Sequence, residues 1–160
     1  MRTRQGLTLA IPMLLAAIAA CGDDDDDTTN PVTNFEADLT GAQETPAVTT
    51  SATGSATVTI EGDQIVYHVE TTGLENVLVS HIHVAPPGEA GPVRLNLCNT
   101  PDTQPCQTGD GVLVDGSNGV TQGGISFDSL VSAIRAGNAY VNVHTEQNQN
   151  GEIRGQLTPQ

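Results

Sequence analysis

From Phe35 to its C-terminus the chain alternates apolar and polar residues in short runs, and this two-residue period restricts its fold more than any other feature. Side chains of a strand point alternately to its two faces, so the alternation predicts strands with one buried face. The runs Ala56–Ile60 and Ile65–Val69 show it most regularly. Because Glu61-Gly62-Asp63 separates them as a turn, the two runs predict a β-hairpin.

The same reasoning predicts one helix among further strands. In Asp128–Gly137 the apolar residues recur at helical intervals, with Asp128 as the expected N-cap and Gly137 as the C-terminal stop. Seven or eight short strands in about 125 residues predict an all-β fold, an antiparallel β-sandwich or Greek-key barrel with one short helix. The further strands are expected at Val77–Val84, Val93–Cys98, Gly119–Phe127, Ala139–Thr145 and Glu152–Thr158.

The N-terminal residues predict export. Met1–Ala20 contains a basic start, an apolar stretch from Leu7 and small residues before Cys21. This order is typical of a signal peptide, and the apolar stretch is too short for a comfortable membrane span. Ile18-Ala19-Ala20-Cys21 resembles the lipobox of bacterial lipoproteins, so we expect a protein anchored by lipid at Cys21 to the extracytoplasmic side of the cell membrane or the outer membrane. The alternative is an ordinary secretory signal in which Cys21 is incidental.

Residues 21–34 predict a tether, which leaves residues 35–160 for a single domain. Asp23–Asp27 is a run of five aspartates, and like charges at this spacing repel one another and bury nothing. Calcium binding by this run is the alternative, but a calcium site needs a shaped loop with carbonyl ligands. We therefore expect a flexible acidic segment between the lipid and the domain.

Charge narrows the range of partners. The formal net charge is −14, with five basic residues and no lysine. Such a surface repels phosphate backbones, so nucleic acid is not expected as a partner, whereas cations and basic protein surfaces are compatible with it. The simpler alternative is that the charge keeps an exported domain soluble.

Two cysteines remain after Cys21. Cys98 and Cys106 lie in a polar stretch, and in an oxidising compartment they most simply form a disulfide. A metal pair is the alternative, although the spacing matches no zinc pattern.

Histidines provide the main chemical signal. His81 and His83 stand two apart on a predicted strand, which places them on one face about 7 Å apart along the chain. His144 lies in another predicted strand, and Glu152 follows on its expected partner strand. If these strands are neighbours, His81, His83 and His144, with Glu152 as a fourth ligand, suit zinc or copper. The alternative is structural: the histidines pack on a half-buried face and bond to backbone carbonyls, Tyr67 or Glu152.

Five segments, in chain order, span the whole predicted domain: Phe35–Pro46, His81-Ile82-His83, Gly91-Pro92-Val93, Ala139–Thr145 and Gly151–Gln156. Together they resemble the CHRD domain, the module named after chordin. The resemblance implies a β-sandwich of immunoglobulin-like or superoxide-dismutase-like character. The cysteine-rich companion modules of chordin are missing, so growth-factor binding is not implied.

The His-x-His pair also resembles the copper-binding strand of copper–zinc superoxide dismutases. The whole chain has four histidines, too few for the dinuclear dismutase site, so only a mononuclear site is compatible with the sequence.

No nucleophile elbow, phosphate loop or dinucleotide fingerprint is present. We expect a non-enzymatic binding or structural module of the cell envelope that recognises a protein or matrix ligand; the alternative is a mononuclear zinc or copper protein, including a metal-dependent enzyme. For Glu44 and the Gly151–Gly155 segment a structural role is expected.

Cys21→Ser tests the lipid anchor. The wild-type protein should partition into the detergent phase of a cell extract, because the acidic segment after Cys21 has nothing apolar to hold it on a membrane. The variant should partition into the aqueous phase. Equal partitioning of both proteins into the aqueous phase would show that Cys21 carries no lipid.

Overall fold

The computed structural model describes residues 33–160. The predicted signal peptide, Cys21 and the aspartate run lie outside the described residues. Within the described part, the one α-helix is too short and too polar to span a membrane.

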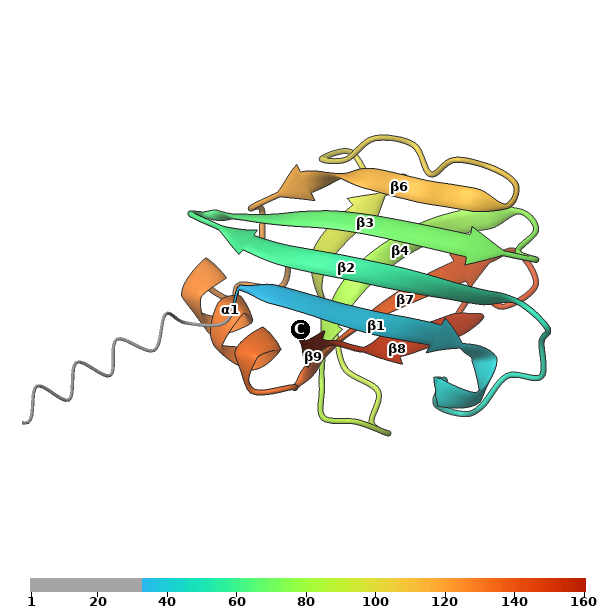
Figure 1. Ribbon diagram of the computed structural model, residues 1–160, viewed down its shortest axis with the longest axis horizontal. Coiled ribbons are helices and arrows are strands. Elements are labelled where there is room, and N and C mark those ends of the chain that lie inside the picture. Colours follow the sequence, from blue (N-terminus) through green and yellow to red (C-terminus); the bar gives the residue numbers. More distant parts are fainter. Residues whose placement is uncertain (1–32) are drawn as a thin grey trace, which may run out of the picture. The chain divides into compact units, whose positions relative to one another are not determined.

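The described chain is a single antiparallel sheet of nine strands with one α-helix and one 3₁₀ turn (Figure 1). Every strand pairing is antiparallel, which confirms the predicted all-β class. The elements are β1 (Asn34–Thr40), η1 (Gly41–Gln43), β2 (Thr53–Glu61), β3 (Gln64–Thr72), β4 (Val77–Val84), β5 (Val93–Cys98), β6 (Gly111–Asn118), α1 (Phe127–Arg135), β7 (Ala139–Thr145), β8 (Ile153–Gln156) and β9 (Thr158–Pro159).

The sheet curls until its two end strands approach each other. Its order is β5-β4-β7-β8-β1-β2-β3-β6, with β9 added beside β1, so β5 and β6 stand at opposite ends although they are consecutive in sequence. The Tyr67 hydroxyl of β3 donates to the Leu97 carbonyl of β5 at 2.9 Å, and the Asn118 amide of β6 donates to the Asn96 carbonyl at 3.0 Å. These bonds between the two ends make the fold a nearly closed barrel.

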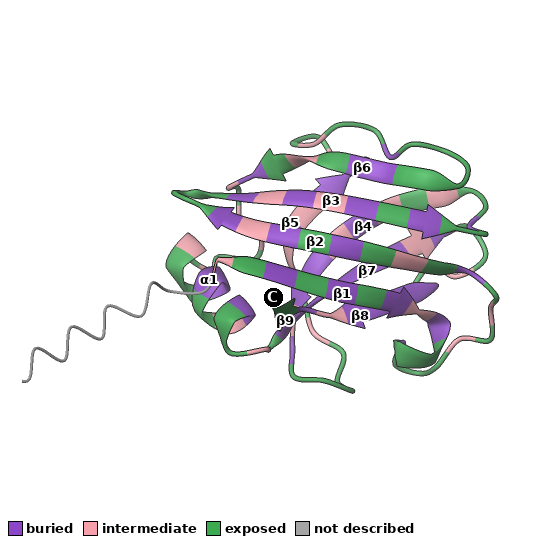
Figure 2. Cartoon of the chain, in the orientation of Figure 1, coloured by how far each residue is buried: buried purple, intermediate pink, exposed green. Residues whose placement is uncertain are grey.

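The core lies inside this curled sheet. Alternate residues of β1, β2 and β3 are buried, as the banding in Figure 2 shows, and Phe35, Leu39 and Ile65 are fully inaccessible. Helix α1 lies at one end of the strands and contributes Leu130 and Ile134 to the same core (Figure 1). The chain has only two Phe, two Tyr and no Trp, and its core is accordingly aliphatic: the buried set is mainly Val, Ile, Leu and Ala.

Three adjacent strands carry polar side chains on the outer face. Ile82 of β4 and Val141 of β7 point into the core. The neighbouring positions therefore point outwards, and the register aligns His81 of β4 with Asn142 of β7 and Arg154 of β8. This row of polar residues crosses the middle of the β4-β7-β8 segment.

Two details of the prediction are wrong. The strand expected at Gly119–Phe127 is not formed: Gly123 and Gly124 have φ of +65° and +74°, which interrupts an extended chain, and the strand lies earlier, at β6. Helix α1 is capped by Ser126 and not by Asp128, because the Ser126 hydroxyl accepts the Ser129 N–H at 3.2 Å.

The predicted disulfide is confirmed. Cys98 at the end of β5 is bonded to Cys106, eight residues later. Inside this loop the Asn99 N–H donates to the Gln104 carbonyl, and the Asn99 side chain accepts the Cys106 N–H. The loop therefore has a defined conformation beside the closing edges of the sheet.

Replacing both cysteines by serine should lower the free energy of unfolding by about 2–3 kcal/mol, because the bond restricts a short loop in the unfolded chain. Urea unfolding of the oxidised wild type and of the Cys98→Ser/Cys106→Ser variant measures the difference. Thiol titration of the denatured, unreduced mature chain should find no reactive thiol. Two reactive thiols per chain, or equal stability of both proteins, would contradict this.

Candidate metal site

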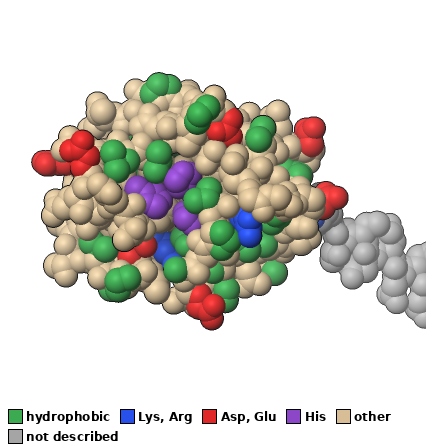
Figure 3. Space-filling model, turned by 180° about the vertical axis from the view of Figure 1, so that it is seen from behind, with side chains coloured by type: hydrophobic (Ala, Val, Ile, Leu, Met, Phe, Trp, Pro, Cys, Tyr) green, Lys and Arg blue, Asp and Glu red, His purple; other side chains and the backbone are tan. Residues whose placement is uncertain are grey.

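Three of the four histidines meet on the outer face of β4 and β7. One side-chain nitrogen from each of His81, His83 and His144 lies within 4.8 Å of the other two. Nδ1 of His81 is 3.3 Å from Nε2 of His144. Figure 3 shows histidine side chains gathered on this face of the molecule.

The strand register explains the cluster. His81 and His83 share a face because they stand two apart on β4, and β7 pairs directly with β4. Val79 is opposite His144 in that pairing, so His144 is diagonal to His81 across the two strands. The condition that the sequence left open, that the two histidine-bearing strands are neighbours, is met.

Backbone carbonyls orient two of the three rings. Nδ1 of His83 is 2.8 Å from the Gly91 carbonyl oxygen, and Nδ1 of His144 is 2.9 Å from that of Gln149. A carbonyl only accepts, so both Nδ1 atoms donate and both neutral rings carry their lone pair on Nε2. An outer hydrogen bond of this kind is typical of metal-binding histidines, because it fixes the tautomer and the ring direction.

Burial keeps the three rings neutral. The pKa of His81 and of His83 is lowered from 6.5 to about 4, mainly by loss of solvent and in part by the neighbouring imidazoles. The pKa of His144 is lowered by burial as well. Near neutral pH the cluster therefore presents unprotonated imidazoles, the form that binds a metal ion.

A stack of side chains supports His83. Its ring lies parallel to that of Tyr140, with centroids 4.8 Å apart, and the Arg154 guanidinium lies 3.4 Å from the Tyr140 ring centroid. Since β7 lies between β4 and β8, the tyrosine ring has the imidazole on one face and the cation on the other. Rotation of His83 would break this stack, so its orientation is fixed from two sides.

Glu152, which the sequence analysis offered as a fourth ligand, is not in the group. One carboxylate oxygen of Glu152 accepts from the Thr50 hydroxyl at 2.8 Å and the other from the Thr145 hydroxyl at 2.6 Å. These bonds lower its pKa against the opposing effect of burial. Glu152 therefore fixes the loop that precedes β8. The fourth histidine, His68, lies on β3, 3.4 Å from Glu70 and 3.8 Å from Asp115.

Two residues beside the cluster, Asn142 and Glu44, were not predicted from the sequence as part of the site. Asn142 is almost completely buried, at 2% exposure, and its Nδ2 is 3.5 Å from a carboxylate oxygen of Glu44. Glu44 is buried too, and loss of solvent raises its pKa although Arg154 opposes the shift. Asn142 could have been found from its place between Tyr140 and His144 on one strand face, whereas Glu44 is 98 residues away in sequence and gave no such signal.

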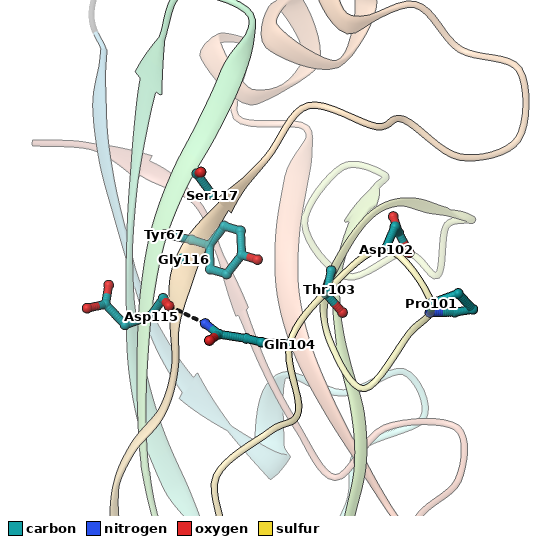
Figure 4. Close-up of a pocket in the computed structure, with 8 residues that line it drawn as sticks. All are labelled: Tyr67, Pro101, Asp102, Thr103, Gln104, Asp115, Gly116 and Ser117. Atoms are coloured by element: carbon teal, nitrogen blue, oxygen red, sulfur yellow. Dashed lines mark hydrogen bonds between the residues drawn. The ribbon is translucent and has the colours of Figure 1, made fainter.

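A concave surface elsewhere has a structural explanation. A cavity of about 450 Å³ separates β3 and β6 from the disulfide loop, with Tyr67 on one side and Asp102 on the other (Figure 4). The Gln104 side chain donates across it to the Asp115 carbonyl. The Asp102 carboxylate accepts from Asn96 at 2.9 Å and from Thr100 at 2.8 Å. These polar groups are used in holding the loop, and no histidine lines the cavity.

The fold and the cluster define an all-β domain with a three-histidine site on its outer face. The CHRD domain family model matches residues 35–157, so the chain belongs to the CHRD domain family. Searches of curated proteins and of solved structures gave no match.

The segments that carry the family resemblance converge on this site. Phe35–Pro46 supplies Glu44, and Gly151–Gln156 supplies Arg154. The His-x-His pair, the Gly91 carbonyl and the strand from Ala139 to Thr145 supply the remainder. Segments that are far apart in the chain thus form the walls of one cluster.

Acid should destabilise the protein through these histidines. Their pKa is near 6.5 in the unfolded chain and lower when folded, so between about pH 6.5 and 4 the unfolded state binds more protons. Stability is complete above about pH 6.5 and decreases as pH falls towards 4, on the order of 2 kcal/mol for buried His83 alone. Urea unfolding in EDTA from pH 7.5 to 5 should show a weaker pH dependence for His83→Gln than for the wild type. Identical slopes would contradict this, and His68→Gln is the control.

Proposed function

We propose that the protein is a lipid-anchored, extracytoplasmic CHRD module that binds one zinc or copper ion through His81, His83 and His144. The observation that carries the proposal is the convergence of one nitrogen from each imidazole within 4.8 Å. Membership of the CHRD family supports a non-enzymatic extracellular binding module. The histidine cluster supplies the ligand chemistry for such a module.

The geometry suits a small transition metal. Nitrogens bonded tetrahedrally to zinc at about 2.05 Å stand about 3.4 Å apart. The His81 to His144 distance of 3.3 Å already has this value, and the widest separation of the three nitrogens is 4.8 Å. In the present arrangement His81 Nδ1 donates to His144 Nε2; a metal there requires the His81 proton to move to its Nε2, and the ring stays neutral.

The donor set selects the metal. Three neutral imidazoles suit zinc and copper, whereas magnesium and calcium prefer carboxylate and carbonyl oxygens. Within residues 33–160 no carboxylate belongs to the histidine group. The acidic surface adds attraction for cations over a longer range, since the formal net charge is −14.

The structural alternative explains less. Bonds from His83 and His144 to backbone carbonyls are what a purely structural role requires. However, Nε2 of His83 is buried and has no hydrogen-bond partner among the described residues. A buried polar atom without a partner costs about 1–3 kcal/mol, and a bound cation removes that cost.

Metal titration of the mature chain in detergent tests the proposal. Calorimetry with zinc and with copper should give one site per chain in the wild type. His81→Ala, His83→Ala and His144→Ala should each weaken binding more than roughly 100-fold, because loss of a direct ligand exceeds the 10–100-fold effect of an outer-shell change. His68→Ala is the matched control and should bind as the wild type does.

Two results would overturn the proposal. One is a wild-type chain that binds neither metal at micromolar concentration. The other is a set of three histidine variants, each folded by circular dichroism, whose affinities equal that of His68→Ala.

A further inference from the structure

Asn142 lies where a fourth ligand would stand. It is on β7, between Tyr140 and His144 and directly opposite His81 of β4. Its side chain is buried at 2% exposure, and its Oδ1 has no hydrogen-bond partner in the described part of the chain. Burial lowers the pKa of His83, and the Asn142 side chain opposes that shift, as a hydrogen-bond acceptor beside the ring does.

Two unpartnered acceptors therefore lie together beside the cluster. The Gly91 carbonyl holds the proton of His83 on Nδ1, so Nε2 of His83 presents a lone pair. Oδ1 of Asn142 presents lone pairs as well, and neither atom has a donor among residues 33–160. Two buried acceptors repel each other unless a cation or a donor stands between them.

We propose that Oδ1 of Asn142 completes the coordination of the metal, and that Glu44 is the positioning residue that directs this oxygen towards the ion. This inference rests on the proposed function, since it names a fourth ligand for the same site. Glu44 accepts from Nδ2 of Asn142, so the oxygen end of the amide faces the histidines. Amide oxygens serve as weak axial ligands at copper sites, which makes copper the better probe.

Gly151 makes room for this arrangement. It has φ of +123°, a conformation that other residues rarely adopt. A Cβ at Gly151 would lie 2.6 Å from Nδ2 of Asn142 and would also overlap the Glu44 carboxylate. The loop before β8 thus approaches the amide and carboxylate closely, and any side chain at residue 151 would push them apart.

Three variants of the mature chain in detergent separate a ligand role of Asn142 from a structural one: Asn142→Ala, Asn142→Asp and Glu152→Gln. We expect Asn142→Ala to weaken copper binding at least about 10-fold and to change the copper(II) electron paramagnetic resonance spectrum, because an oxygen ligand is lost. Asn142→Asp keeps an oxygen at that position and adds a negative charge, so it should restore or strengthen binding. Glu152→Gln should leave affinity and spectrum unchanged. Asn118→Ala is the matched control, because Asn118 is also buried but has hydrogen-bond partners of its own.

Glu44 is tested through the same spectrum. Glu44→Gln retains an oxygen that can accept from Nδ2 of Asn142 and should keep the wild-type copper spectrum, whereas Glu44→Ala should shift it towards that of Asn142→Ala. A purely structural contact would lower stability without moving the spectrum.

The outcomes distinguish the two proposals. If the histidine variants lose copper but Asn142→Ala keeps wild-type affinity and spectrum, Asn142 is not a ligand and the histidine site stands. Loss of affinity in Glu152→Gln with none in Asn142→Ala would make Glu152 the ligand. If Asn142→Ala does not fold, copper binding that is clearly weaker in Asn142→Asp than in the wild type would overturn the inference. A wild-type chain that binds no copper overturns both proposals.

Discussion

Burial of β7 on both faces is the constraint on which the site depends. Strands β1, β2 and β3 alternate between buried and exposed residues, but β7 is buried at every position from Ala139 to Thr145 except the half-buried His144. One face of β7 supplies Val141 and Val143 to the core. The other carries Tyr140 and Asn142, so a strand in the middle of the sheet buries polar groups that an ordinary outer face would leave in water.

Buried polar groups have to find partners, and loops provide them here. Burying a hydrogen-bonding group without a partner costs about 1–3 kcal/mol. The Gly91 carbonyl precedes β5 and the Gln149 carbonyl precedes β8, and each accepts from a histidine. The same bonds that hold these loops on the sheet direct the two Nε2 atoms towards a common position. The loops and the histidines are therefore positioned by one set of contacts.

The sequence predicts the strands well where apolar residues dominate a run and poorly where glycines with positive φ interrupt it. Val77–Val84 and Val93–Cys98 are strands with the predicted bounds, because β-branched and apolar residues dominate both. Gly119–Phe127 fails, since it contains enough apolar residues to resemble a strand while two of its glycines have positive φ. Such a conformation leaves little trace in an apolar–polar pattern.

The same distinction applies to the site, where contacts between neighbouring strands were predictable and contacts with distant loops were not. Convergence of His81, His83 and His144 followed from a period of two and one assumption about neighbouring strands, which the register of β4 and β7 meets. Glu152 was predicted as a fourth ligand because it follows on the expected partner strand of the strand that carries His144. Its exclusion depends on Thr50, about a hundred residues earlier in the chain, whose hydroxyl binds one carboxylate oxygen. Glu44, in contrast, lies beside Asn142 because of the path of its loop, which no local sequence pattern predicts.

The dispersed sequence signature of this CHRD domain has a physical explanation in that geometry. Each segment contributes one wall: β4 the paired histidines, β7 the tyrosine and asparagine, the loop after β1 a buried carboxylate, and the residues before and within β8 a glycine and an arginine. A change in any wall disturbs its neighbours, because Arg154 packs on Tyr140, Tyr140 on His83, and Glu44 on both Asn142 and Gly151. Residues coupled in this way are recognisable as a set although each segment alone is unremarkable. The set lies on the outer face and outside the hydrophobic core, so the family pattern describes a feature of the protein surface as well as the core.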